Sequence, residues 1–178
     1  MGEEINTRLK TVFSDCGRYR PILSRTGTKD SLATGDRRFT WVMLNPSKAD
    51  ATTNDPTINR VVNFTARFGG AHLHVINLFD YCATKPRDLT KAKIPLQSPH
   101  WHLNITIAIT ECDELIFAWG SPKYPLIRYR FEDARLIIEK TAAIARKTPM
   151  CLRINMDGNP AHPLYQSSKT TLIPYTKP

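Results

Sequence analysis

The sequence predicts an α/β fold: a three-layer α/β/α sandwich with a mostly parallel, four-stranded central sheet and an N-terminal edge strand or hairpin. Three observations lead to this prediction. Short apolar runs alternate with segments of helical periodicity, as in βαβ units. Most of the apolar runs end at asparagine, glycine or proline, which stop strands. The 178 residues and the hydrophobic fraction of 41% suit one buried core, so we expect a single domain over residues 1–178.

The chain begins with an expected edge strand over residues 16–25, where Pro21 limits backbone pairing. Residues 26–38 are rich in glycine and charged side chains, which indicates a polar loop. Residues 39–44 form a short apolar run that is typical of a buried parallel strand. We therefore expect this strand to deliver the next loop at its carboxyl end.

A helix is expected to begin near Asp55, a capping residue, with Pro56 in its first turn. Apolar residues recur at helical spacing until the glycine pair that starts at Gly69, which ends the helix. Residues 72–79 predict a second buried strand, and residues 86–95 predict a loop with several lysines. This strand–helix–strand order favours parallel pairing.

The second half repeats the alternation. Residues 98–109 predict a helix that opens with Ser-Pro, and residues 114–120 predict a strand that ends in glycine. Residues 131–146 predict a strongly amphipathic helix, because alanine and isoleucine recur on one face. Residues 150–154 predict a fourth strand, which turn-forming residues 157–160 follow.

The composition is basic, with 25 Lys and Arg against 16 Asp and Glu, a net charge of +9 and a pI near 9.6. This excess favours a polyanionic partner such as DNA, and a merely soluble basic surface is the alternative. The polar N-terminus and the lack of a long apolar run predict no secretory signal and no membrane span. Four dispersed cysteines without a C-x-x-C pair predict reduced thiols in a cytoplasmic protein, with no metal or other cofactor. No obligatory protein partner is indicated.

Unusual polar residues gather where the predicted strands end. Four such segments are 45–47, 77–79, 120–122 and 162–165. Ligands of open α/β sheets bind outside the carboxyl ends of the strands. The sequence therefore predicts a binding site that these four segments share.

The same segments, in this order, resemble the uracil-DNA glycosylase superfamily. Leu44-Asn45-Pro46 resembles its water-activating motif, and Val75-Ile76-Asn77 resembles the strand whose asparagine reads the flipped base. Residues 115–121 resemble its third strand and small-residue turn, and Ala161-His162-Pro163-Leu164 resembles its final motif, in which a leucine wedge follows a histidine. The chain is also similar, over roughly residues 10–165, to a small bacterial and phage family of unknown function with Met-Leu-Asn-Pro-Ser and His-Pro-Leu-Tyr motifs.

The resemblance implies a role for each segment, and base cleavage needs a placed water, donors for the departing base and an extruded nucleotide. The expected catalytic residues are Asn45, His162 and Asp55; a helix cap is the first explanation of Asp55, and assistance to a water beside Asn45 is the alternative. Residues expected to hold the base are Leu44, Pro46, Ser47, Asn77, Phe79 and Phe64, and the two phenylalanines are otherwise core residues. Residues expected to contact DNA are Lys48, Lys85, Arg87, Gly120, Ser121, Lys123, Pro163, Leu164 and Tyr165; either Leu164 or Tyr165 is the wedge.

The implied activity is that of a monofunctional DNA glycosylase that excises a modified pyrimidine and leaves an abasic site. Ser47 stands where uracil-specific enzymes of the superfamily carry a tyrosine that excludes the thymine methyl group, so a bulkier base is expected. Glucosylated hydroxymethylcytosine of phage DNA, in anti-phage defence, is the specific expectation from the resemblance. The alternatives are a non-catalytic module that binds a modified base or nucleic acid, and a nucleotide or nucleoside N-glycosidase.

Overall fold

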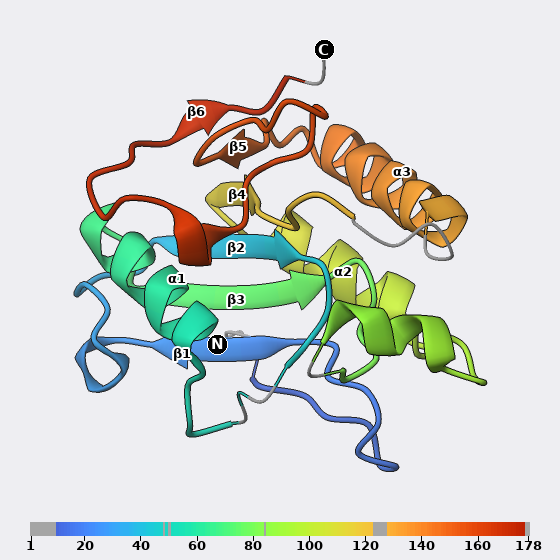
Figure 1. Ribbon diagram of the computed structural model, residues 1–178. Coiled ribbons are helices and arrows are strands. Elements are labelled where there is room, and N and C mark those ends of the chain that lie inside the picture. Colours follow the sequence, from blue (N-terminus) through green and yellow to red (C-terminus); the bar gives the residue numbers. More distant parts are fainter. Residues whose placement is uncertain (1–9, 48, 50, 84, 123–127, 177–178) are drawn as a thin grey trace.

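The computed structural model describes residues 10–47, 49, 51–83, 85–122 and 128–176, and it contains a six-stranded mixed sheet (Figure 1). The strands run across the sheet in the order β1-β3-β2-β4-β5-β6. Their bounds are Leu23–Thr26 for β1, Arg38–Met43 for β2, His72–Asn77 for β3, Glu114–Phe117 for β4, Met150–Cys151 for β5 and Ile173–Pro174 for β6.

The pairing of the strands confirms the α/β class. β2 lies between β3 and β4 and runs parallel to both, and β4 is parallel to β5. The edge strands β1 and β6 are antiparallel to β3 and β5. The sheet is thus larger than the sequence predicts, because β6 adds a strand. β6 has two residues, one of them proline, and so short a strand leaves no periodic signal in a sequence.

Three α-helices cover the two faces of this sheet. They are α1 (Pro56–Arg67), α2 (Trp101–Thr110) and α3 (Arg128–Ile144). α1 begins as the sequence predicts, because the Asp55 Oδ1 accepts a hydrogen bond of 2.9 Å from the Ile58 backbone N–H. α1 lies on one face, while α2 and α3 lie on the other (Figure 1).

A separate hydrophobic core fills the space on each face of the sheet. Trp41 of β2 packs with Val61 in the core between the sheet and α1. Its neighbour Val42 packs with Ile105 and Phe131 in the core on the opposite face, under α2 and α3. All of these side chains are buried. Alternate residues of β2 therefore serve opposite cores, which explains why the strand is apolar without interruption.

Some expected loops contain short 3-10 helices. Residues 86–95, expected as a loop, include η2 (Pro86–Lys91), and the polar loop 26–38 includes η1 (Thr28–Asp30). The His-Pro-Leu-Tyr segment forms η4 (Pro163–Tyr165). Proline suits the first position of η2 and η4, because a backbone N–H at that position has no acceptor within the helix. These 3-10 helices have only one or two turns, which is too short to produce a periodic pattern in the sequence.

Strand order determines where a ligand can enter. The chain passes from β2 to β3 on one side and later places β4 on the other side of β2. The loops therefore diverge beyond the carboxyl end of β2, which makes this end a topological switch point, where open α/β sheets bind ligands. Within the described ranges, no helix is long and apolar enough to cross a membrane.

Candidate functional site

A cleft of about 580 Å³ opens at the carboxyl ends of β2, β3 and β4. Its walls come from the loop after β2, the end of β3, the turn after β4, the start of α1 and the η4 segment. Ten residues expected from the sequence line it: Leu44, Asn45, Ser47, Asp55, Asn77, Gly120, Ser121, His162, Leu164 and Tyr165. The volume is in the range of small-molecule sites. The predicted convergence of the four segments is therefore confirmed.

Asn45 is fixed by the backbone around it. Its Nδ2 donates hydrogen bonds to the carbonyl oxygens of Pro46 at 2.9 Å and Ala83 at 2.8 Å. These two bonds use both amide hydrogens. The side-chain oxygen remains as an acceptor in the wall of the cleft, which suits it to hold a water molecule. An amide cannot take up the proton that such a water would lose.

Asn77 ends β3 inside the cleft and is 2% exposed. Its backbone carbonyl accepts a hydrogen bond of 2.9 Å from the Trp101 indole N–H, which fixes the end of the strand. Within the described part of the chain, the buried Nδ2 of Asn77 has no hydrogen-bond partner. A buried amide without a partner costs about 1–3 kcal/mol. An acceptor on a ligand in the cleft would remove this cost.

His162 enters the cleft just before η4. Its Nδ1 accepts a hydrogen bond of 3.3 Å from the Leu164 backbone N–H, so the neutral ring carries its proton on Nε2. Burial lowers the pKa of His162 below its usual value, and the negative charge of Asp55 partly opposes this shift. His162 is therefore a neutral hydrogen-bond donor near pH 7, held close to the carboxylate that caps α1.

The turn after β4 lets the η4 segment approach closely. Gly120 has φ +74°, and a Cβ added there would lie 3.3 Å from the Cβ of His162. Its backbone N–H donates to the Pro160 carbonyl at 2.9 Å. Ser121 then accepts a hydrogen bond of 3.1 Å from Asn155. Glycine at position 120 thus serves both the left-handed backbone conformation and the close contact with His162.

The rim of the cleft presents an aromatic ring to solvent. Tyr165 is 81% exposed, whereas its neighbour Leu164 is half-buried. The Tyr165 ring lies 5.9 Å from the His162 ring, measured between centroids. Of this pair, Tyr165 therefore has the larger exposed fraction at the rim of the cleft.

The structure corrects both phenylalanine assignments. Phe64 of α1 is buried against Trp41 of β2, and Phe79 is buried in the opposite core. Neither one lines the cleft, although Phe79 lines a smaller hollow on another part of the surface. Both side chains serve the two cores, as apolar aromatic residues of helices and inner strands commonly do. Among the described residues, the aromatic side chains that do line the cleft are Trp119 and Tyr165.

Other expected contacts also lie outside the cleft wall. Pro46 and Pro163 are buried and shape the backbone beside it, and Lys85 and Arg87 are exposed on the η2 segment. Lys48 and Lys123 lie outside the described residues. The lysine-rich loop therefore does not contribute to the cleft itself.

Arg20, Thr57, Arg153 and Asn155 line the cleft but were not expected from the sequence. Arg20 precedes β1 and is buried at 2% exposure. Arg153 is exposed at the mouth and donates a hydrogen bond of 3.2 Å to Asn155. An arginine before an edge strand carries no local signal of this placement. The antiparallel pairing of β1 with β3 brings Arg20 to the site.

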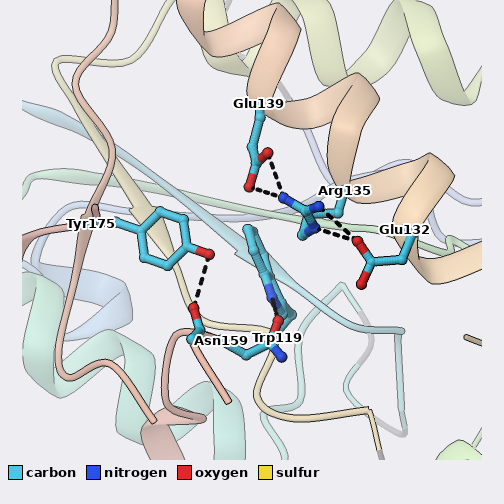
Figure 2. Close-up of polar contacts among 7 residues, drawn as sticks. Trp119, Glu132, Arg135, Glu139, Asn159 and Tyr175 are labelled. Carbon is cyan, nitrogen blue, oxygen red and sulfur yellow. Dashed lines mark hydrogen bonds and ion pairs between the residues drawn. The ribbon is translucent and has the colours of Figure 1, made fainter. Parts of the chain in front are cut away.

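A polar network behind Trp119 supports the wall of the cleft (Figure 2). Arg135 of α3 forms ion pairs of 2.6 Å with both Glu132 and Glu139. The Trp119 indole N–H donates to the Asn159 side-chain oxygen at 3.2 Å. The Tyr175 hydroxyl donates to the Gly158 carbonyl at 3.1 Å. The contacts of Trp119 and Tyr175 fasten the turn at residues 158–159, which leads into the His162 segment.

Metal binding has no visible basis in the described residues, where no three His, Cys, Asp or Glu side chains group closely enough to hold an ion. His72 and His74 share a strand, yet each bonds a hydroxyl group of β1. The His74 Nδ1 lies 3.0 Å from the Ser24 hydroxyl, and the His72 Nδ1 lies 2.6 Å from that of Thr26. Their role in the described structure is to join β1 to β3.

The fold and the cleft define an α/β protein with a cleft at a topological switch point of its sheet, the place where open α/β sheets bind ligands. Residues 18–164 match the family described as "Protein of unknown function (DUF1643)", and the chain belongs to this family. The matched range includes every residue that lines the cleft except Tyr165 and Gln166. No curated protein and no solved structure gives a significant match.

Proposed function

We propose that the protein is a monofunctional DNA glycosylase, which flips a modified pyrimidine into the cleft and hydrolyses its N-glycosidic bond. The observation that carries this proposal is the buried amide of Asn77, whose Nδ2 lacks a partner in the described structure while it lines the cleft. Pyrimidine bases present carbonyl oxygens and ring nitrogens that accept such a hydrogen bond. An extruded base would therefore complete a site that is otherwise unsatisfied.

Asn45 supplies the nucleophile by position. Both hydrogens of its side-chain amide are bound to the carbonyl oxygens of Pro46 and Ala83. The side-chain oxygen is then the atom that accepts a hydrogen bond from a water beside the sugar. Positioning lowers the entropy cost of attack, but no proton is abstracted by an amide. The enzyme is therefore expected to turn over slowly and to depend on how well the leaving base is stabilised.

His162 acts on the departing base. Its Nε2 carries the proton because Nδ1 accepts from Leu164, and a neutral donor can bond a base oxygen that gains negative charge. Asp55 caps α1 and keeps a negative charge near the ring. Its role is to cap α1, as expected from the sequence, and to act electrostatically on His162.

The net positive charge of the chain and the residues at the rim of the cleft support DNA as the substrate. The chain has a net charge of +9, which favours a polyanion through counterion release. Arg153 at the mouth is placed for a phosphate group, and the exposed Tyr165 is placed to fill the space that a flipped base leaves. Among modified pyrimidines we favour a bulky one, because Ser47 in the wall is small. Glucosylated hydroxymethylcytosine of phage DNA, in anti-phage defence, remains our specific candidate.

Base release can be measured directly. Duplex and single-stranded oligonucleotides with uracil, hydroxymethylcytosine or glucosylated hydroxymethylcytosine at one position are incubated with the protein and then treated with alkali. Alkali-dependent breaks at that position support the proposal, and they should vanish in Asn45→Ala. Asn59→Ala, an exposed asparagine on α1, is the matched control and should keep full activity.

A non-catalytic base-binding module is the second candidate, favoured by the fact that residue 45 is an amide rather than a carboxylate. The same assay separates the two functions. Tight, base-dependent DNA binding without release of any base in the panel, and without breaks after alkali, would replace the glycosylase proposal with the module.

A further inference from the structure

Arg20 is a buried cation in the wall of the cleft. It precedes β1, in a segment that lies beside the carboxyl end of β3, where the Arg20 backbone N–H donates to the Asp80 carbonyl at 2.8 Å. This pairing is three residues beyond Asn77, which reaches into the same cleft. The side chain of Arg20 is therefore held near the position that the proposed function assigns to the base.

The guanidinium also contacts the loop that follows β2. Its Nη1 donates a hydrogen bond to the Ala49 carbonyl, four residues after Asn45. Burial raises the pKa of Cys82, and the positive charge of Arg20 opposes this shift. The field of the guanidinium thus reaches the segment beyond β3. A charge at 2% exposure acts through a medium of lower dielectric constant than water, so its effect on a ligand is enlarged.

We infer that Arg20 is a catalytic residue that stabilises the negative charge of the departing base, an inference that rests on the proposed function. When the bond between the sugar C1′ and the base nitrogen breaks, the base keeps the electron pair and becomes an anion. Water adds to C1′ and releases a proton to solvent, and the base anion later takes a proton from solvent. A buried cation that faces the base lowers the energy of the anion before it is protonated.

This role predicts a dependence on the leaving group. Bases that form stable anions need little help, whereas bases that form unstable anions depend on the cation. Loss of one preorganised group of this kind typically lowers kcat by about 10²–10³-fold. Arg20→Met should show such a loss on the least acidic base that the enzyme releases and a much smaller loss on a more acidic analogue. Arg20→Lys keeps the charge and should keep the wild-type dependence.

Arg25 offers a matched control. It is 3% exposed and also binds the loop after β2, through the Ala51 carbonyl at 3.1 Å and the Asn54 side-chain oxygen at 2.9 Å. It does not line the cleft. Arg25→Met should therefore lower the melting temperature while leaving the dependence on the leaving group unchanged.

The experiment measures single-turnover base release from DNAs with 5-fluorouracil, uracil and 5-hydroxymethyluracil, and with 5-formylcytosine and 5-hydroxymethylcytosine, ordered by the acidity of the released base. A steeper dependence in Arg20→Met than in the wild type and Arg25→Met supports the inference. Equal slopes in all three proteins, with active wild type, overturn the inference alone. No base release by the wild type, from these DNAs or from DNA with glucosylated hydroxymethylcytosine, overturns the proposed function and the inference with it.

A second measurement covers the case in which Arg20→Met does not fold. Free 5-fluorouracil is used to inhibit the wild-type enzyme at increasing pH, so that a growing fraction of the inhibitor is anionic. Tighter inhibition as the inhibitor ionises is expected from a cationic base pocket. Inhibition that weakens or stays constant as the anion forms overturns the inference without any variant.

Discussion

Replacing Asn77 with leucine should stabilise the free protein and impair its activity. Leucine has nearly the shape of asparagine and no polar atoms. In the described structure the Asn77 Nδ2 is buried without a partner, which costs about 1–3 kcal/mol. Asn77→Leu should therefore raise the free energy of unfolding by about 1–3 kcal/mol. For a chain of this length, each kcal/mol corresponds to an increase in Tm of roughly 2–4 °C. The backbone contact with Trp101 does not depend on the side chain and should remain.

The same substitution leaves a polar edge of the bound base unpaired. The lost hydrogen bond should lower the rate of base release roughly 5- to 150-fold, the equivalent of 1–3 kcal/mol. Thermal and urea unfolding measure the first effect, and single-turnover base release measures the second. Asn63→Leu, on the exposed face of α1, is the control and should change neither. A destabilised Asn77→Leu, or one with full activity, would refute the reasoning.

Three further predictions follow from the structure. Activity should fall as the pH drops through the lowered pKa of His162, because a proton on Nδ1 abolishes the hydrogen bond from the Leu164 backbone N–H that holds the ring. The negative charge of Asp55 raises the pKa of His162, so Asp55→Asn should move this loss of activity to lower pH in the rate profile. Burial lowers the pKa of His74 from 6.5 to about 4. As the pH falls, this histidine is therefore protonated in the unfolded chain before it is protonated in the folded protein. Roughly 3 kcal/mol of the free energy of unfolding should be lost between pH 6.5 and pH 4. In urea titrations at several pH values, His74→Gln should make the free energy of unfolding less dependent on pH. An unchanged pH dependence in this variant would contradict the prediction. Tyr165→Ala should lower activity on duplex DNA roughly 5- to 150-fold if the ring stacks between bases, while Tyr129→Ala, equally exposed on α3, should have no effect.

The main features of the fold could be predicted because they depend on local patterns. The capping side chain of Asp55 and the proline that follows it mark the start of α1, and the structure has both in these roles. The continuous apolar run of β2 reflects burial on both faces by two cores. The pair of residues that forms β6 could not be predicted, because its pairing with β5 is a long-range contact without periodic sequence.

The candidate site could be predicted where it follows from strand order. Asn45 and Asn77 each stand at the end of a parallel strand, and parallel strands present these ends on one edge. Arg20 could not be placed, because only the pairing of a distant edge segment with the end of β3 brings it to the cleft. Phe64 and Phe79 were misplaced because aromatic side chains suit a core and a base platform equally well in a sequence.

The central claim is that water held at Asn45 replaces a base on DNA, and the joint release of an intact base and an abasic site tests it most directly. The reaction would be run in water enriched in heavy oxygen, with DNA that contains the preferred modified base, and the products analysed by mass spectrometry. We predict an intact, unlabelled free base, an abasic sugar that carries one heavy oxygen atom, and neither product from Asn45→Ala. If the DNA instead stays intact and bound, with its modified base in place, Asn45 does not direct water to the sugar.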